Sequence, residues 1–333
     1  MAISATSHTN FLQVYGGEVV LAYNEAAKLK DRLMNRSISS GKSASFPTYA
    51  TETAKLHASG SDILADGVAS GATSGEKVIT IENLLYAAQL VDELDEFKSH
   101  YDIRGSLAKQ SGAALATQHD AMLLGIMAKK ATTYHTHTHA TGYSSTAKFS
   151  TIAEILAMIE EVAAKMDNLA VPAEERCLVL RPFEYYQLLT SDAALSRDFN
   201  TTGDRAKGQQ SFNYLGFDVI ASKVQKDFGG NTQAQMDDAG KPLYLGGVAP
   251  GQGANTYSPY VNTAGGTTGG SENTNNWYAT AFHKGSAGTV TLRGVKAEVN
   301  YIPERNANLL NTKVALGVDV IRPEGIVMIT ADN

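Results

Sequence analysis

The stretch from residue 37 to residue 91 constrains the fold most, because it is extended in character yet has too few apolar side chains for a core. Residues 37–47 are rich in small side chains, 57–76 are rich in glycine, and 77–81 alternate like a strand that continues through 84–91. Two extended arms around a glycine-rich tip predict a long β-hairpin. An isolated hairpin is marginal in water, so we expect this one to lean on another subunit.

The rest of the chain shows both helical and extended patterns. A loose N-terminal arm leads into a short amphipathic helix around 18–34, and the longest helical stretch is 102–130. Thr151 and Glu154 form a capping box that begins a further helix, and Pro182 begins another. The strand patterns lie at 177–180, 214–221, 277–283, 288–301, 314–321 and 326–329. Strands and helices in this order predict an α+β or α/β layer.

Three segments are irregular. Within 288–301 the apolar phase shifts after Gly294, which predicts a β-bulge at that glycine. Residues 229–276 contain 11 glycines and few large apolar side chains, which predicts a long surface loop. The polar segment 131–149 is expected to be a loop or a small hairpin.

Composition excludes several classes of protein. The chain has 28 Lys and Arg against 34 Asp and Glu. The net charge of −6 argues against a protein whose main function is to bind phosphate groups, as nucleic-acid-binding proteins do. It has no apolar run of about 18 residues and no basic, apolar leader, so we expect neither a membrane span nor a secretory signal. Cys177 is the single cysteine, which excludes an internal disulfide framework and a multi-cysteine metal site.

A run of alternating histidines is the one motif that suggests a metal. On an extended segment His135, His137 and His139 would project from one face. Three imidazoles can bind zinc, nickel or iron. Metal sites usually draw ligands from more than one segment, and no second segment is evident here. An exposed polar loop is therefore the main interpretation, and a metal at a symmetry axis is the alternative.

Other reactive groups do not assemble into a recognisable active site. Gly41-Lys42-Ser43 is not a phosphate loop, because the glycine that such a loop needs five positions earlier is Arg36. Cys177 lies in an apolar strand far from any histidine, so it is expected to be a buried structural thiol. Carboxylates cluster at an expected helix start, where they favour a solvated or subunit-contacting face over acid–base chemistry: Asp92, Glu93, Asp95 and Glu96. We expect neither an enzyme nor a cofactor.

Five blocks of the chain carry a resemblance to a known family: 36–44 with Phe46-Pro47, 76–81 with Leu84-Leu85, His100 to Arg104, Ser286 to Val290, and Arg322-Pro323-Glu324. They resemble the major capsid proteins of short-tailed, T-seven-like bacteriophages, which have the HK97-like fold. The order of parts agrees with that family, and the matching blocks cover roughly residues 11–125 and 277–330. The middle of the chain agrees only in element order.

The resemblance implies an α+β chain with the HK97-like layout. An N-terminal arm would span 1–36, and the extended hairpin called the E-loop would span 37–91. A P-domain with a long spine helix and long strands would comprise 92–149 and 277–312. An A-domain would comprise 150–276 and 313–333, with the glycine-rich loop 229–276 on it.

The resemblance also implies a virion protein that builds a shell. Hexamers and pentamers would tile an icosahedral capsid around double-stranded DNA, without sequence specificity and without a membrane, after assembly in the host cytoplasm. Because the chain begins almost directly at the arm, a separate scaffolding protein is expected, together with a portal protein and room for a decoration protein. Lys42, Lys55 and Lys77 lie on the hairpin without a buried carboxylate to mark a crosslink, so the shell is expected to be non-covalent.

Charged residues near the hairpin are the expected contacts between subunits. The candidates are Arg36, Lys42, Lys77 and Arg104, with the acidic residues Asp92, Glu93, Asp95 and Glu96 as their partners on an adjacent copy. Charge reversal at Lys42 is expected to impair assembly and leave the monomer folded. Two alternatives remain open: a phage tail or fibre protein whose histidine run binds metal, and a hydrolase that acts through residues 150–276.

Overall fold

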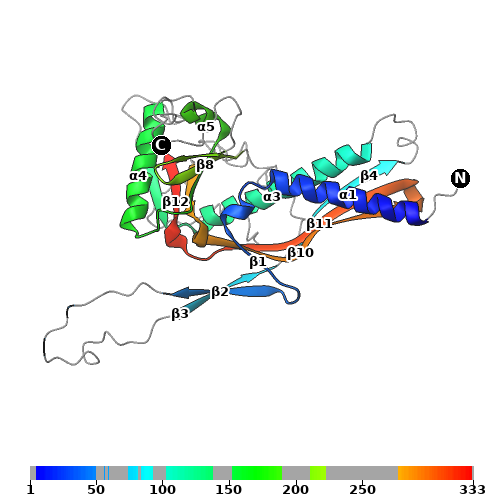
Figure 1. Cartoon of the computed structure of the whole chain (residues 1–333), viewed down its shortest axis with the longest axis horizontal. Helices are drawn as coiled ribbons and strands as arrows, with labels where there is room; N and C mark the ends of the chain where they lie inside the picture. Colours follow the sequence, from blue (N-terminus) through cyan, green and yellow to red (C-terminus); the bar gives the residue numbers. More distant parts are fainter. Residues whose placement is uncertain are drawn as a thin grey trace, which may run out of the picture.

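Two β-sheets that share a helical layer form the body of the chain (Figure 1). The structure is a computed structural model, and it describes residues 5–49, 56, 59, 74–81, 84–92, 103–137, 152–189, 211–222 and 277–331. The long sheet has the strand order β1 (Met34–Ser37), β10 (Ala287–Ile302), β11 (Ala307–Val320) and β4 (Leu84–Asp92). β1 is parallel to β10, and the other two pairings are antiparallel.

The second sheet has six strands. Their order is β5 (Thr133–His137), β12 (Ile326–Ala331), β9 (Trp277–His283), β6 (Arg176–Leu180), β8 (Phe217–Ala221) and β7 (Ser211–Tyr214). Helices α4 (Ile152–Asn168) and α5 (Pro182–Leu189) pack on one face of this sheet. The other face joins the core under α3 (Ile103–Lys130), so one long helix serves both sheets.

Strand alternation divides the apolar side chains of the six-stranded sheet between two cores. In β6, Leu178 and Leu180 face α4, whereas Cys177 and Val179 face the core of α3. Every residue of β6 is buried, as expected for a central strand with both faces covered.

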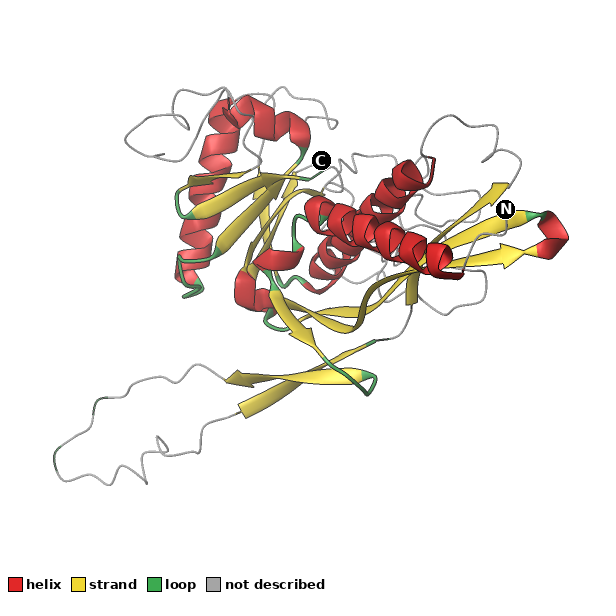
Figure 2. Cartoon of the chain, turned by 45° about the vertical axis from the view of Figure 1, so that its right-hand side comes forward, coloured by secondary structure: helices red, strands yellow, loops and turns green. Residues whose placement is uncertain are grey.

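Helix α1 (Ala5–Ala26) crosses α3 at close range above the long sheet (Figure 2). A Cβ added at Gly112 would lie 2.6 Å from the carbonyl oxygen of Val19, so only glycine allows the two backbones to approach this closely. Beside the crossing, the Tyr23 hydroxyl lies 2.8 Å from Nδ1 of His119, whose Nε2 lies 3.4 Å from Oγ1 of Thr289. This buried polar chain connects α1 and α3 to β10.

A third pair of strands forms the hairpin β2 (Ser43–Tyr49) and β3 (Ser74–Thr80), which pair antiparallel. The hairpin lies on the side of the long sheet opposite to α1 and α3 (Figures 1 and 2). Within the expected tip at 57–76, residues 74–76 already belong to β3, and apart from residue 59 the remainder lies outside the described residues, as does the glycine-rich segment 229–276.

Most elements expected from the sequence are confirmed. The α+β class, the long helix, the helices at residues 152 and 182 and the bulge near Gly294 are present, the last as register shifts between Thr291 and Lys296. None of the described helices is long and apolar enough to cross a membrane.

Four expectations are wrong in detail. Residues 214–221 are not one strand, because Tyr214 ends β7 and a turn at Leu215 and Gly216 leads into β8. The N-terminal helix begins at Ala5 and ends at Ala26, instead of spanning 18–34, because the Asp120 carboxylate accepts hydrogen bonds from the backbone N–H groups of Lys28 and Leu29 and turns the chain there. Residues 84–91 do not continue the hairpin but pair with β11 as β4. Residues 133–137 form strand β5, paired with β12, instead of a loop or a small hairpin.

Burial of His119 predicts that the chain loses stability in acid. Burial, reinforced by the charge of Lys30, lowers the pKa of His119 from 6.5 to about 4, so the folded chain disfavours the charged imidazole. The stabilisation is complete above pH ~6.5 and is lost as pH falls toward ~4, with a slope of up to about 1.4 kcal/mol per pH unit. The measurement is denaturant unfolding of the unassembled chain across this range.

The variant His119→Gln provides the comparison for this pH series. It removes the titrating group, so its free energy of unfolding should fall less steeply between pH 6.5 and 4 than that of the wild type. If the free energies of unfolding of the two proteins fell in parallel with pH, the acid sensitivity would not arise from His119.

Candidate interaction site

The root of the hairpin is buried against the body of the chain. Ala44, Phe46 and Ile79 point inward and pack against Val290 of β10 and Ile321 at the end of β11. A two-stranded ribbon has no core of its own, so these contacts with the long sheet fix the hairpin in place.

Two glycines of the long sheet make room for the hairpin. A Cβ at Gly317 would lie 2.3 Å from the carbonyl oxygen of Thr80, which is shorter than any real contact of that kind. A Cβ at Gly288 would lie 2.9 Å from Cδ1 of Ile321 and 3.3 Å from Cδ1 of Ile79. The hairpin backbone therefore rests directly on the backbone of β11.

Charged and polar contacts also hold the root. Nζ of Lys77 lies 3.4 Å from Oδ2 of Asp319, and Lys130 at the end of α3 pairs with Oδ1 of the same carboxylate. The guanidinium of Arg36 donates a hydrogen bond to the carbonyl oxygen of Ser45. The structure thus places two of the residues expected between subunits, Arg36 and Lys77, in contacts within one chain.

Of the other charged residues considered for the hairpin and its contacts, Lys42 lies beside this root, Asp92 and Arg104 lie elsewhere, and the rest are outside the described residues. Lys42 is exposed in the turn before β2, and its carbonyl oxygen accepts a hydrogen bond of 2.7 Å from the N–H of Ile81. Asp92 is exposed at the far end of β4. Arg104 lies in the first turn of α3. The residues outside the described part are Lys55, Glu93, Asp95 and Glu96, together with the side chain of Arg104.

The histidine run lies partly in a strand. His135 and His137 belong to β5, the edge strand next to β12, and His139 lies outside the described residues. Within the described residues, no three His, Cys, Asp or Glu side chains are grouped so as to hold a metal ion. The metal interpretation of the run stays a prediction.

The face of the long sheet away from α1 and α3 carries large apolar side chains that are exposed. In β4, Leu85 and Ala87 pack toward the helices. Alternation therefore places Leu84, Tyr86 and Leu90 on the opposite face, where they are 50%, 67% and 45% exposed. Apolar side chains gathered in this way mark interaction sites, and we call this surface the open sheet face.

A basic cluster adjoins these apolar side chains. Lys296 and Lys313 are direct cross-strand partners, a placement that is unfavourable for two like charges. Glu298 lies between them, with its carboxylate oxygens 3.0 Å from Nζ of Lys296 and 2.6 Å from Nζ of Lys313, and these hydrogen bonds lower the pKa of Glu298. Arg293 lines a cavity with both lysines and is the third cation of this basic cluster.

The bulge hollows the sheet at this cluster. A cavity of about 120 Å³ is lined by the basic side chains of Arg293, Lys296 and Lys313 and by Leu84, Gly294 and Ala315. Sequence reasoning missed this surface. The phase shift at Gly294 was its only signal, and the register between β10 and β11 was needed to bring the three cations together.

Cys177 has the environment expected of a structural thiol. It is buried in β6, and burial raises its pKa to about 12 in spite of the opposing effect of Arg32. The thiol therefore stays protonated near neutral pH, where a nucleophilic cysteine would need to be a thiolate.

The glycine at the hairpin root predicts a sharp effect of mutation. Gly317→Ala should destabilise the unassembled chain by about 1–3 kcal/mol, because its Cβ cannot fit against Thr80 without moving backbone. Gly294→Ala is the matched control, since a Cβ there meets nothing within 4 Å, and its effect should stay within about 0.5 kcal/mol. Denaturant unfolding measures both, and equal effects would contradict the close packing at the root.

Comparison with known sequences identifies relatives along nearly the whole chain. The profile of a family described as "Gp10A-like: Major capsid protein" matches residues 45–330. The major capsid protein of Escherichia phage T7 is 27% identical over 328 residues, which cover 94% of this chain and 89% of that protein. The major capsid protein of Enterobacteria phage T3 is 26% identical, with 94% and 89% covered.

Solved structures show the same fold. The capsid structure of cyanophage P-SCSP1u matches with a TM-score of 0.64 and 21% identity, over 91% of this chain and 87% of that chain. The mature capsid of bacteriophage PhiM1 matches with a TM-score of 0.59 and 14% identity, over 91% and 86%. These matches confirm the HK97-like fold and the resemblance to capsid proteins of T7-like phages, and they favour neither the tail or fibre alternative nor the hydrolase.

Proposed function

Since the chain belongs to the Gp10A-like family of major capsid proteins, we propose that the β2–β3 hairpin of one copy rests on the open sheet face of the next. Copies of the chain form the capsid of a virion. The observation that carries the proposal is the exposed apolar surface on both elements: Val78 is 47% exposed on the hairpin, and Tyr86 is 67% exposed on the sheet.

The two surfaces are complementary in charge as well as in apolar character. Val78 and Glu76 alternate with the inward-facing Lys77 and Ile79, so they share the outer face of the hairpin. On the open sheet face, the basic cluster adjoins Leu84 and Tyr86. A hairpin laid across this face would bury Val78 on apolar side chains and bring Glu76 to Arg293, Lys296 or Lys313.

Distances along β11 support a contact between copies. Asp92 pairs with Ala307, whereas the hairpin root rests on Gly317, ten residues further along the strand. Ten residues of strand span about 33 Å. Lys42 can therefore meet Asp92 only on another copy, and the expectation for Lys42 stands as part of this proposal.

Repetition of one contact between identical copies closes into rings, and it multiplies a weak contact many times over. We propose hexamers and pentamers that enclose double-stranded DNA without sequence specificity, in keeping with the net charge of −6. A scaffolding protein, a portal protein and a decoration protein are the proposed partners, and assembly takes place in the host cytoplasm. Shell building is the proposed role of the chain, with no reaction catalysed and no cofactor bound.

A charge-swap series tests the contact between hairpin and sheet. Glu76→Lys alone and Lys313→Glu alone should each reduce the yield of closed shells by about tenfold or more, because each places like charges together at every copy of the contact. The double variant should recover most of the yield. Negative-stain electron microscopy of the chain expressed with its scaffolding protein counts the shells.

The series has two controls. Circular dichroism should show that each single variant remains folded, and Lys313→Arg should assemble normally because it keeps the charge. A double variant no better than the worse single variant would refute the pairing. Failure of the wild type to form shells or rings under any condition would refute the proposed function itself.

The expected non-covalent shell has a simple test. Boiling purified particles in detergent should release intact monomers of 35.4 kDa, because only non-covalent packing and charge interactions are expected to hold the copies together. A ladder of linked subunits would show covalent crosslinks. In that case, Lys42→Arg and Lys77→Arg would identify which lysine reacts.

A further inference from the structure

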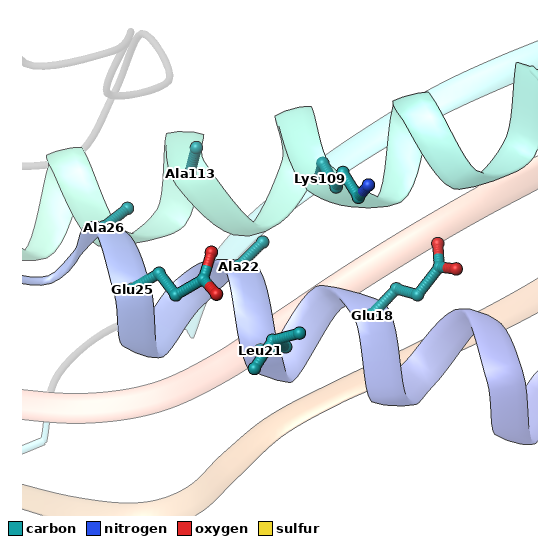
Figure 3. Close-up of a pocket in the computed structure, with 7 residues that line it drawn as sticks. All are labelled: Glu18, Leu21, Ala22, Glu25, Ala26, Lys109 and Ala113. Carbon is teal, nitrogen blue, oxygen red and sulfur yellow. The ribbon is translucent and has the colours of Figure 1, made fainter.

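A groove between α1 and α3 forms a second surface, distinct from the hairpin and the open sheet face (Figure 3). It has a volume of about 300 Å³. Ala22, Ala26 and Ala113 provide small side chains along it, Leu21 and two glutamates rise from α1, and Lys109 rises from α3: the lining is Glu18, Leu21, Ala22, Glu25, Ala26, Lys109 and Ala113.

The larger side chains of the groove are without ionic partners. In the part of the chain that the structure describes, Glu18, Glu25 and Lys109 form no ion pair within 4 Å. Leu21 is 59% exposed although it is large and apolar. The close contact of α1 with α3 at Gly112 involves the backbone of Val19 and Tyr23 and the side chain of Ala22, so it does not account for the exposed Glu18, Leu21 and Glu25.

The spacing of the glutamates indicates the shape of a partner. Glu18 and Glu25 are seven residues apart on one helix, which places them on the same side and about 10.5 Å apart along the axis. Leu21 lies one turn after Glu18, between the two carboxylates. A second helix laid alongside could carry basic residues at the same spacing, with an apolar residue between them.

We propose that this groove binds a basic amphipathic helix of a separate protein. The alanines allow close approach of a helix backbone, Leu21 provides apolar contact, and Glu18 and Glu25 pair with two lysines or arginines seven positions apart. Lys109 on the opposite wall favours an acidic or neutral residue on the edge of the helix that faces α3.

The sequence of the chain argues against a second copy as the occupant. Among the described helices, none carries two basic residues seven positions apart: α1 and α5 have no Lys or Arg, α4 has only Lys165, and those of α3 are Arg104, Lys109, Lys129 and Lys130. The proposal goes beyond the contact between copies and does not depend on it.

A designed peptide tests the groove. The probe is a fluorescent helical peptide of about 20 residues, with two lysines seven positions apart and leucine and alanine on the same face. Fluorescence anisotropy with the unassembled full chain should show binding. Moving one lysine so that the spacing becomes five should weaken the affinity, because the two ammonium groups then lie on different sides of the helix.

Matched variants locate the site. Glu18→Gln with Glu25→Gln should weaken binding about tenfold or more, because two ion pairs are lost. Glu160→Gln with Glu174→Gln, two exposed residues elsewhere, makes the same change in net charge and should leave binding unchanged. Ala113→Leu should block the groove, whereas Ala114→Leu, at the exposed next position, should not.

Three results would overturn the proposal. The first is failure of the wild type to bind either peptide. The second is equal affinity of the two glutamine double variants, which would indicate only a general attraction to an acidic protein. The third is self-association, measured by light scattering, that the Glu18→Gln and Glu25→Gln changes abolish, which would assign the groove to a second copy. Glu76→Lys should bind the peptide normally, which separates this test from that of the hairpin contact.

Discussion

The apolar face of the β2–β3 hairpin is buried only because the long sheet covers it. Val290, Ile321 and the bare backbone at Gly317 provide that cover. With the root fixed in this way, the outer face of the hairpin, with Val78 and Glu76, is held away from the body and available to another molecule. The hairpin, whose outer face needs a neighbouring molecule to cover it, is therefore fixed in place by the long sheet of its own chain.

The position of the hairpin on the long sheet depends on an apolar core that spans both sheets. Helix α3 packs on β11 and on the inner face of the six-stranded sheet, so Leu123, Val314 and Val179 belong to one apolar cluster. Where the chain passes between the sheets, the hydroxyl of Ser286 donates to the carbonyl oxygen of Gly325 at 2.9 Å, and the backbone N–H of Ile321 donates to the carbonyl oxygen of Ser286 at 2.7 Å. These contacts join the two sheets at the end of the long sheet where the hairpin is seated.

Local pattern was enough to predict the elements whose cause is local. The capping box at Thr151 and the proline at residue 182 each predict a helix start from a few neighbouring residues, and the phase shift at Gly294 predicts a β-bulge in the same way. Pairing partners could not be predicted this way: residues 84–91 alternate identically whether they continue a hairpin or lie beside β11. The basic cluster required the register that sets Lys296 against Lys313, and the end of α1 required Asp120, which is distant in sequence.

Of the candidate contact residues, Arg36 and Lys77 were singled out by charge alone, and charge does not reveal that their partners are Ser45 and Asp319 of the same chain.

The position of Asp319 between two lysines bears on how force passes through the subunit. Its carboxylate holds Lys77 of the hairpin and Lys130 at the last residue of α3 at the same time, and β5 of the other sheet begins at Thr133, directly after that helix. In the proposed assembly, a load placed on the hairpin by a neighbouring copy would pass through this one carboxylate, as well as through the apolar root, into the strand, the long helix and the second sheet. Asp319 thus connects the thin ribbon to the rest of the subunit.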